Sequence, residues 1–150
     1  MEIRKAELKD LEIVQNLNNE LFELERKCYD EYLSESWTFE GGGKESFENA
    51  IKNDYVIIAD VDGEPAGYLH GIIVKHPYYD FEIAEISDLC VGKDYRGFGV
   101  GSKLCKSFEE YYRQKGITHF QMTASYRNES ARAFYRKMGY KEHNVTLVKF

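Results

Sequence analysis

An arginine and three glycines stand together in the stretch RGFGVGS, residues 96–102, directly before a segment with helical periodicity. A strand that ends at Val91, a glycine-rich turn and a helix that begins near Gly99 would direct several backbone N–H groups toward one point, where an anion can bind. Glycine suits such a loop because a Cβ would keep phosphate oxygens away from the amides and would disfavour positive φ. The spacing matches neither a P-loop nor the G-x-G-x-x-G dinucleotide pattern. The stretch therefore predicts an anion-binding loop of another kind.

This loop has the form R-x-x-G-x-G inside the longer stretch L-C-V-x-x-x-Y-R-G-x-G-V-G, residues 89–101. A second stretch, N-x-S-A-R-A-F-Y-R-K-M-G-Y, occupies residues 128–140. Both stretches, and the order of the expected elements, resemble the GNAT superfamily of N-acetyltransferases. Two motifs at the correct spacing are far more specific than a lone glycine loop. The resemblance covers the chain and implies an acetyl-CoA-dependent N-acetyltransferase.

The resemblance also implies how acetyl-CoA, the cosubstrate, would bind. The amides of residues 96–102 would hold its pyrophosphate, and its pantetheine arm would lie between splayed strands that end at Val91 and Ala124. The backbone N–H of Val91 would polarise the thioester carbonyl, while Asn128 would cap its helix, contact the pantetheine arm, or do both. One or more of Arg127, Arg132, Arg136 and Lys137 would meet the 3′-phosphate. The residues expected to bind the cosubstrate are Leu89, Cys90, Val91, Arg96, Gly97, Phe98, Gly99, Val100, Gly101, Ser102 and Asn128.

Acetyl transfer to an amine requires a neutral amine, a polarised carbonyl and a proton for the departing thiolate. Tyr135 matches the family's tyrosine that protonates the thiolate, and its ordinary pKa of about 10 suits that role. A packing role is the alternative for Tyr135 and the expectation for Phe134. Glu85 falls on the glutamate of the histone acetyltransferase branch when residues 84–91 are aligned without gaps, and it is the expected general base. Asp88, which lies nearer the thioester, and water remain alternatives, as does a purely polar strand face for Glu85.

In this family the first helix pair and the turn between the third and fourth strands form the wall against which the acceptor lies. Here both segments are rich in carboxylates and aromatic rings, which attract ammonium groups and hold cations. We expect a primary and cationic amine, such as a polyamine, a lysine side chain or an aminoglycoside-like amine, which attacks directly in a ternary complex. A loop that merely faces water is the alternative. The alternative function is a non-catalytic acyl-CoA-binding module. The expected acceptor residues are Tyr29, Asp30, Glu31, Trp37 and Tyr79, with Tyr32, Glu35, Glu40, Tyr78, Asp80 and Glu82 beside them.

The elements that must position these residues follow from hydrophobic periodicity and from glycine breaks. Helices are expected at residues 11–29, 44–53, 100–116 and 128–139. Strands are expected at residues 2–7, at 55–74 as a hairpin that turns at Asp62-Gly63, and at 81–91, 117–125 and 140–150. A loop that ends in three glycines is expected at residues 29–43. Simple alternation places Glu85, Ser87, Leu89 and Val91 on one strand face, and Ala84, Ile86, Asp88 and Cys90 on the other.

This order agrees with the α/β (α+β) fold that the resemblance implies. That acyl-CoA N-acyltransferase fold has a mixed, mostly antiparallel sheet of six to seven strands, flanked by about four helices, with strands 4 and 5 splayed. We expect one such domain over residues 1–150.

Composition and charge limit the remaining possibilities. Residues 1–90 carry a net charge of −13 and residues 91–150 one of +7, which together give −6. The acidic first part disfavours nucleic-acid binding. The three cysteines are odd in number and the four histidines are scattered, so neither a disulfide framework nor a metal site is predicted. No apolar run reaches the roughly 18 residues of a membrane span. We expect a cytoplasmic protein without a membrane partner, whose terminal strand would be available to pair in a homodimer.

Overall fold

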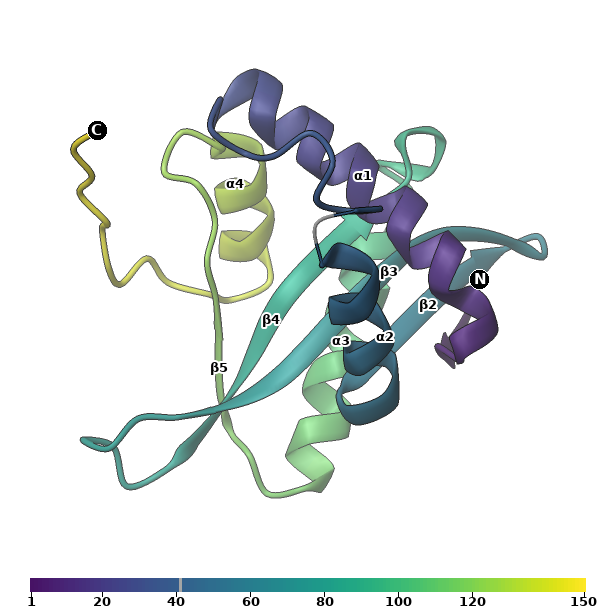
Figure 1. Ribbon diagram of the computed structural model, residues 1–150. Helices are drawn as coiled ribbons and strands as arrows, with labels where there is room; N and C mark the ends of the chain where they lie inside the picture. Colours follow the sequence, from purple (N-terminus) through teal and green to yellow (C-terminus); the bar gives the residue numbers. More distant parts are fainter. Residues whose placement is uncertain (41) are drawn as a thin grey trace.

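The computed structural model describes residues 1–40 and 42–150 (Figure 1). Gly41, which belongs to the expected three-glycine loop, lies outside the described residues. The five strands of the sheet follow chain order in space, and the first four are antiparallel to their neighbours. The fifth strand pairs parallel to the fourth. The strands are β1 Glu2–Lys5, β2 Tyr55–Val61, β3 Glu64–Lys75, β4 Glu82–Val91 and β5 His119–Met122.

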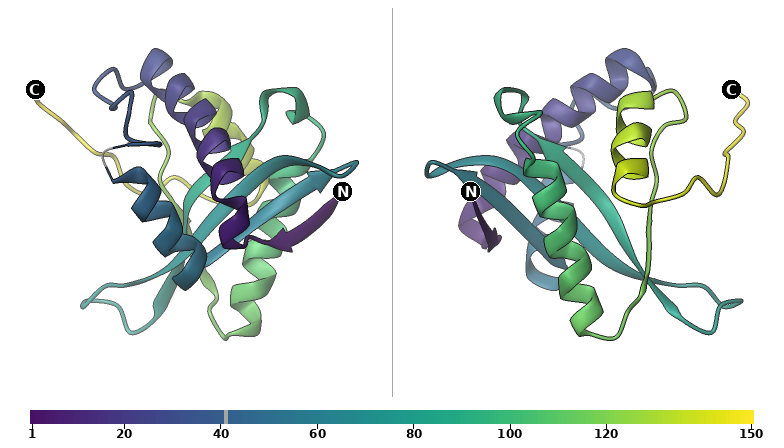
Figure 2. Two further views of the ribbon diagram at one scale, coloured as in Figure 1. Left: turned by 45° about the vertical axis from the view of Figure 1, so that its right-hand side comes forward. Right: turned by 180° about the vertical axis from the view of Figure 1, so that it is seen from behind.

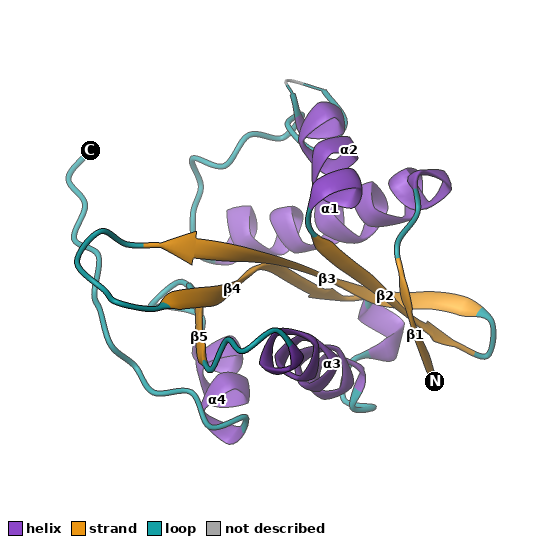
Figure 3. Ribbon diagram, turned by 90° about the horizontal axis from the view of Figure 1, so that it is seen from below, coloured by secondary structure: helices purple, strands orange, loops and turns teal. Residues whose placement is uncertain are grey.

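Two helices cover each face of this sheet, and Figure 3 shows the layers edge on. The first pair, on one face, is α1 Leu11–Cys28 and α2 Gly43–Asn53, and the second pair, on the other, is α3 Val100–Gln114 and α4 Glu129–Lys137. Short 3-10 turns at Leu8–Asp10 and Lys93–Tyr95 precede α1 and α3. The expected mixed, mostly antiparallel sheet with four flanking helices is therefore confirmed.

Alternation along the central strands divides the hydrophobic core into two layers, because successive strand residues face opposite sides of the sheet. Val56 and Ile58 of β2 pack with α1 and α2, while Ile57 packs with α3. The predicted hairpin turn between β2 and β3 is confirmed, since Asp62 and Gly63 both have positive φ, at 52° and 84°.

A β-bulge in β4 overturns the expected assignment of its faces. His70 of β3 pairs with Asp88 and the next residue, Gly71, pairs with Ile86, so Ser87 has no partner in β3. The extra residue reverses the alternation at that point. On the side toward α3 lie Ala84 and Ile86 before the bulge, but Leu89 and Val91 after it. Glu85 therefore shares the face of Asp88 and Cys90, toward α1 and α2, and not that of Leu89 and Val91.

The expected terminal strand at residues 140–150 is wrong, and the described sheet has five strands in place of six to seven. After α4 the chain runs along the outside of the molecule to its end (Figures 1 and 2). Val145, Leu147 and Phe150 are exposed, and the Phe150 ring contacts that of Tyr32 at a tilt of 35°, with ring centroids 4.4 Å apart. Alternating apolar residues favour a strand, but they form one only where a neighbouring strand supplies hydrogen bonds. Within the described part of the chain, no helix is both long and apolar enough to cross a membrane.

Candidate functional site

The predicted anion-binding loop connects β4 to α3. Gly97 and Gly99 have φ of 83° and 82°, a left-handed conformation that side chains with a Cβ rarely adopt. Gly99 is the N-cap of α3, which begins at Val100, and residues 96–99 are exposed. The Arg96 Nε donates a hydrogen bond to the Val91 carbonyl oxygen at 3.0 Å, which ties the loop to the end of the strand. The positive end of the α3 dipole therefore faces solvent beside exposed amides, as an anion site requires.

The second motif packs directly against this loop. A Cβ added to Gly101 would lie 3.3 Å from the Phe134 ring and 3.6 Å from Val91 Cγ2. Glycine at this position therefore allows α4 to approach the first turn of α3, in which Ser102 is half-buried. Phe134 is a packing residue of the core, as expected. Two motifs separated by about 30 residues are thus brought together at the end of β4.

The strands β4 and β5 separate beside this loop. Their pairing covers Ile83 to Ile86 of β4 only, and from Ser87 onward β4 continues without β5 (Figure 1). The expected splayed strands are therefore confirmed. Leu89 and Val91 contact the core around α3. The Cys90 side chain points the other way, where its Sγ donates to the Leu17 carbonyl oxygen at 2.8 Å, and burial raises the pKa of this thiol to about 12. Cys90 can thus meet a ligand in the split only through its backbone.

Tyr135 lies on the inner face of α4 and is 7% exposed. Its ring stands edge to face with those of Phe134 and Tyr140. Burial is the main reason that its pKa is raised, and the neighbouring Cys105, Tyr140 and Asp88 add to the shift. Tyr135 is therefore protonated at neutral pH, as a proton donor must be.

Asn128 caps α4 and also connects it to α1. Its Oδ1 accepts a hydrogen bond from the Ala131 backbone N–H at 3.0 Å, and its Nδ2 lies 3.3 Å from Glu25 Oε1. Burial raises the pKa of the half-buried Glu25 carboxyl, against the lowering effect of the Asn128 hydrogen bond. The expected cap is thus present. Glu25 was not anticipated from the sequence, because a glutamate on the polar side of an amphipathic helix gives no signal there.

Two carboxylates project from β4 toward α1 and α2. Glu85 accepts a hydrogen bond from Gln121, directly opposite on β5, within the part of the sheet where the two strands are still paired. Asp88 lies past the bulge, where β5 has left, and its Oδ2 is 3.5 Å from His70 Nδ1. His70 Nε2 lies 2.8 Å from Asp54 Oδ2 at the end of α2. His70 was not anticipated from the sequence either, since its two partners, Asp54 and Asp88, are both more than a dozen residues away along the chain.

The expected acceptor residues do not form a single wall. Trp37 is half-buried and packs between Phe22 and Phe47, with ring centroids 5.4 and 5.6 Å apart. The turn that carries Tyr79 extends away from the loop between α1 and α2 (Figures 1 and 2). By contrast, the chain at Tyr29, Asp30 and Glu31 follows the end of α1 and lies beside α4, where Arg127 Nη1 is 3.5 Å from the Tyr29 carbonyl oxygen.

The basic side chains near α4 are largely paired. Arg132 and Arg136 both contact Glu142, at 2.9 and 2.7 Å, and both also contact Glu129.

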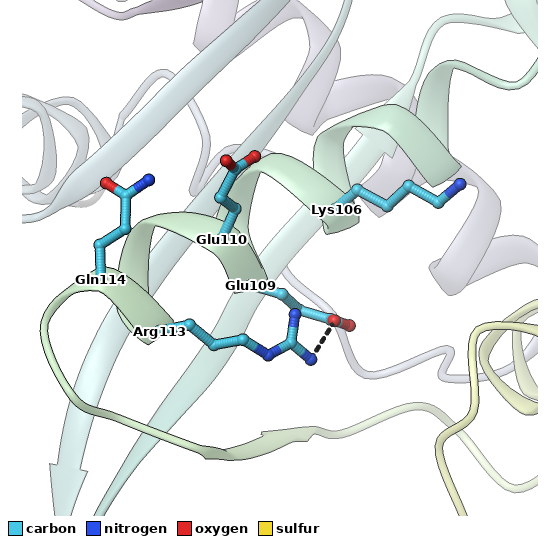
Figure 4. Close-up of a pocket in the computed structure, with 5 residues that line it drawn as sticks. All are labelled: Lys106, Glu109, Glu110, Arg113 and Gln114. Atoms are coloured by element: carbon cyan, nitrogen blue, oxygen red, sulfur yellow. Dashed lines mark hydrogen bonds and ion pairs between the residues drawn. The ribbon is translucent and has the colours of Figure 1, made fainter.

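A separate shallow hollow of about 530 Å³ lies on the outer surface of α3, and it contains none of the predicted site residues (Figure 4). Its lining residues are Lys106, Glu109, Glu110, Arg113 and Gln114. Among the described residues no group of three or more His, Cys, Asp or Glu could hold a metal ion.

The model of the family described as "Acetyltransferase (GNAT) family" matches residues 18–140. An uncharacterized N-acetyltransferase of Methanocaldococcus jannaschii, MJ1530, is 27% identical over 146 residues, which cover 97% of this chain and 81% of that protein. The aminoalkylphosphonate N-acetyltransferase of Salmonella typhimurium is 30% identical over 88 residues, 59% of this chain and 57% of that protein. The structure is similar to that of PaiA N-acetyltransferase from Thermoplasma acidophilum in complex with coenzyme A, with a TM-score of 0.80, 24% identity, and coverage of 97% and 92%.

Proposed function

Because this chain belongs to the GNAT family of acetyl-CoA-dependent N-acetyltransferases, we propose that it transfers the acetyl group of acetyl-CoA to the primary amine of a small, cationic acceptor. The amine attacks the thioester directly while donor and acceptor are both bound. One observation carries this proposal. An exposed glycine loop at the N-terminus of α3 lies beside the split between β4 and β5, and Tyr135 is buried in the core that the last residues of β4 contact.

The donor would lie along the loop and the split. The amides of residues 96–102 would hold the pyrophosphate, since Gly97 and Gly99 adopt the left-handed conformation that exposes them. The pantetheine arm would follow β4 past the bulge, where the strand lacks a partner on the β5 side. The Val91 N–H would polarise the thioester carbonyl, and Asn128, at the start of α4, would contact the arm.

The reaction forms a bond between the amine nitrogen and the acetyl carbon and breaks the bond between that carbon and sulfur. The thiolate takes a proton from the Tyr135 hydroxyl, whose raised pKa keeps it protonated beforehand. The nitrogen loses two protons in all, one from the ammonium ion before attack and one from the tetrahedral adduct as the carbon–sulfur bond breaks, and both pass to a base on the side of the sheet that faces α1 and α2. Glu85 and Asp88 both project there. Tyr135 recovers its proton from solvent after CoA leaves.

A cationic acceptor is supported by the charge of the segment next to α4. Asp30 and Glu31 are exposed after α1, and the half-buried Glu25 lies one turn before them. Carboxylates in such a position attract an ammonium group and disfavour an anionic substrate. The aminoalkylphosphonate enzyme acts, by its name, on an amine that also bears a phosphonate. We expect this chain to prefer an acceptor without such an anionic group.

The test is release of the free CoA thiol from acetyl-CoA with spermidine, a lysine-containing peptide, an aminoglycoside, aminoethylphosphonate and a neutral aromatic amine. Turnover with the cationic acceptors, and little with the other two, is the expected result. Tyr135→Phe should lower kcat by roughly 10²-fold or more while leaving CoA affinity unchanged.

Tyr112→Phe is the matched control, because Tyr112 is a second tyrosine buried in the same core and lies on α3. This control should keep the wild-type rate. Tight acetyl-CoA binding without turnover of any acceptor would contradict the proposal and favour a non-catalytic acyl-CoA-binding module. Equal losses in the two variants would instead remove Tyr135 from the mechanism.

A further inference from the structure

A line of three titratable side chains crosses the sheet next to the bulge. His70 is on β3, with its side chain 14% exposed, between Asp54 at the end of α2 and Asp88 on β4. Its Nε2 is 2.8 Å from Asp54 Oδ2 and its Nδ1 is 3.5 Å from Asp88 Oδ2. Both ring nitrogens therefore face carboxylates. The Asp54 side chain is 35% exposed, so the far end of the line reaches solvent, while Asp88 is 22% exposed at the end near the split.

The bulge determines which carboxylate can meet the reacting atoms. Glu85 is held by Gln121 where β4 and β5 are still paired, which places it before the split opens. Asp88 lies after Ser87, beside the unpaired part of β4. It is also close enough to Tyr135 for its charge to contribute to the raised pKa of the tyrosine hydroxyl. Asp88 thus stands nearer than Glu85 to the position at which the thioester would bind.

The other groups around His70 do not compete for its proton. Its direct partner on β2 is Val56, an apolar residue. On the same face of β3, the Tyr68 hydroxyl accepts a hydrogen bond from Asn18 of α1, and burial raises its pKa. Burial also raises the pKa of the Cys90 thiol, next to Asp88 along β4. Asp54 and Asp88 are therefore the partners that can exchange a proton with the imidazole ring.

We infer that Asp88 is the carboxylate that takes the proton from the attacking amine, and that His70, backed by Asp54, is the positioning residue that holds this proton afterwards. The inference rests on the proposed function and assigns the base that the function leaves open.

The proton can be followed atom by atom. At the start the acceptor is an ammonium ion, Asp88 is a carboxylate, and His70 is neutral, with Nε2–H donated to Asp54 and a lone pair on Nδ1. An N–H bond of the ammonium breaks and its proton moves to an Asp88 oxygen and then to His70 Nδ1. The products are a neutral amine ready to attack, an Asp88 carboxylate and an imidazolium ion between two carboxylates. The Asp88 carboxylate takes the second proton of the nitrogen when the tetrahedral adduct collapses. After the product leaves, Asp88 and His70 Nδ1 each release a proton to solvent, which restores the starting state; Tyr135 takes up one proton, so one proton is released net.

This assignment makes activity depend on neutral His70. Burial by itself lowers the pKa of His70, but its contacts with Asp88 and Asp54 more than offset that effect and raise it above the ordinary value of 6.5. The wild-type kcat/KM should therefore rise with pH along a limb centred above 6.5. Removing the Asp54 charge weakens the preference for the imidazolium form, so the limb should move to lower pH in Asp54→Asn. A purely structural role for Asp54 would not move it.

The experiment measures kcat/KM against pH with one cationic acceptor, alongside an NMR titration of the His70 ring. Asp88→Asn should lower kcat/KM by roughly 10²-fold at neutral pH. His70→Gln should lose the limb and a smaller part of the activity, and Asp54→Asn should shift the limb and the NMR midpoint together. His143→Gln, which removes an exposed histidine of the C-terminal segment, is the matched control and should retain the wild-type profile.

The possible results distinguish a failure of the role assigned to His70 from a failure of the proposed N-acetyltransferase function. Provided that the wild-type protein is active, two results would overturn the role of His70. One is a pH limb that persists in His70→Gln. The other is a pH limb that stays in place in Asp54→Asn although the NMR midpoint of His70 moves. If His70→Gln does not fold, the isosteric Asp54→Asn variant decides alone. A loss of activity in Glu85→Gln that exceeds the loss in Asp88→Asn would reassign the base. A wild-type protein without turnover on any acceptor refutes the proposed function itself, and the role of His70 with it.

Discussion

Gly99 and Gly116 lie at opposite ends of α3 and form a matched pair for testing the anion-binding loop. Their φ angles are +82° and +83°, and a Cβ at either position would meet no atom within 4 Å. Alanine at either site therefore causes no clash, but its left-handed backbone costs about 1–2 kcal/mol. A loss of about 1 kcal/mol lowers the Tm of a chain of this length by roughly 2–4 °C. Gly99→Ala and Gly116→Ala should consequently lose similar stability.

The two substitutions should differ in their effect on CoA. The loop can relieve the strain at Gly99 by rotating its peptide planes, and this would turn amides away from the pyrophosphate. A hydrogen bond to a charged group contributes about 1.5–3 kcal/mol, so the loss of one weakens the Kd roughly 10- to 150-fold. Gly116 is at the far end of the helix, where the same strain leaves the loop undisturbed.

Thermal unfolding followed by circular dichroism gives the two stabilities, and isothermal titration calorimetry with CoA gives the two affinities. We expect similar Tm values and a weakened Kd in Gly99→Ala alone. If Gly99→Ala bound CoA as tightly as the wild-type protein, the assignment of this loop to the pyrophosphate would be wrong. An equal weakening in both variants would show that the loss reflects general destabilisation.

Two further predictions concern stability. Asn128→Ala removes the cap of α4 and should lower the free energy of unfolding by about 1 kcal/mol in urea titrations. Asn128→Ser keeps a capping oxygen and should lose only part of this free energy. Equal losses in the two variants would assign the effect to the contact with Glu25. The raised pKa of His70 means that its protonation stabilises the folded state fully below the unfolded value of 6.5, and that this contribution is lost as pH rises through the folded pKa. The free energy of unfolding should fall across that window in the wild type and change less in His70→Gln; a parallel pH dependence in the two proteins would contradict the charge pairing.

The sequence predicts those features that depend on neighbouring residues. The helices, the turn at Asp62-Gly63 and the glycine loop follow from periodicity and from residues that tolerate positive φ. The cap at Asn128 is of the same kind, because the residue and the amide that it caps are three positions apart. In each case the information lies within a few residues, so a single sequence contains it.

Features that depend on pairing between distant segments could not be predicted. The bulge at Ser87 depends on the register between β3 and β4, and it alone moves Glu85 to the face of Asp88. The site at His70 brings together one residue that follows α2, one from β3 and one from β4, and these residues are far apart in the sequence. The terminal segment shows the opposite case, in which a predicted strand is not formed. The alternating apolar residues within residues 140–150 are compatible with a strand, but in the structure this segment is not part of the sheet.

The groups around the split differ in whether they keep or exchange their protons near neutral pH. Burial raises the pKa of Tyr135, so this hydroxyl stays protonated from roughly pH 6 to 9 and contributes no limb there. The contacts of His70 with two carboxylates raise its pKa above the ordinary value of 6.5, against the lowering effect of burial. Tyr135→Phe should therefore lower kcat/KM at every pH without changing the shape of the profile, whereas His70→Gln should change the shape. Tyr135 gives a proton to the sulfur and His70 holds a proton from the nitrogen, so the effect of one substitution on the pH profile is independent of the effect of the other. A profile whose shape changed in Tyr135→Phe would mean that the tyrosine itself titrates in this range, and the separation of acid and base on opposite sides of β4 would then be wrong.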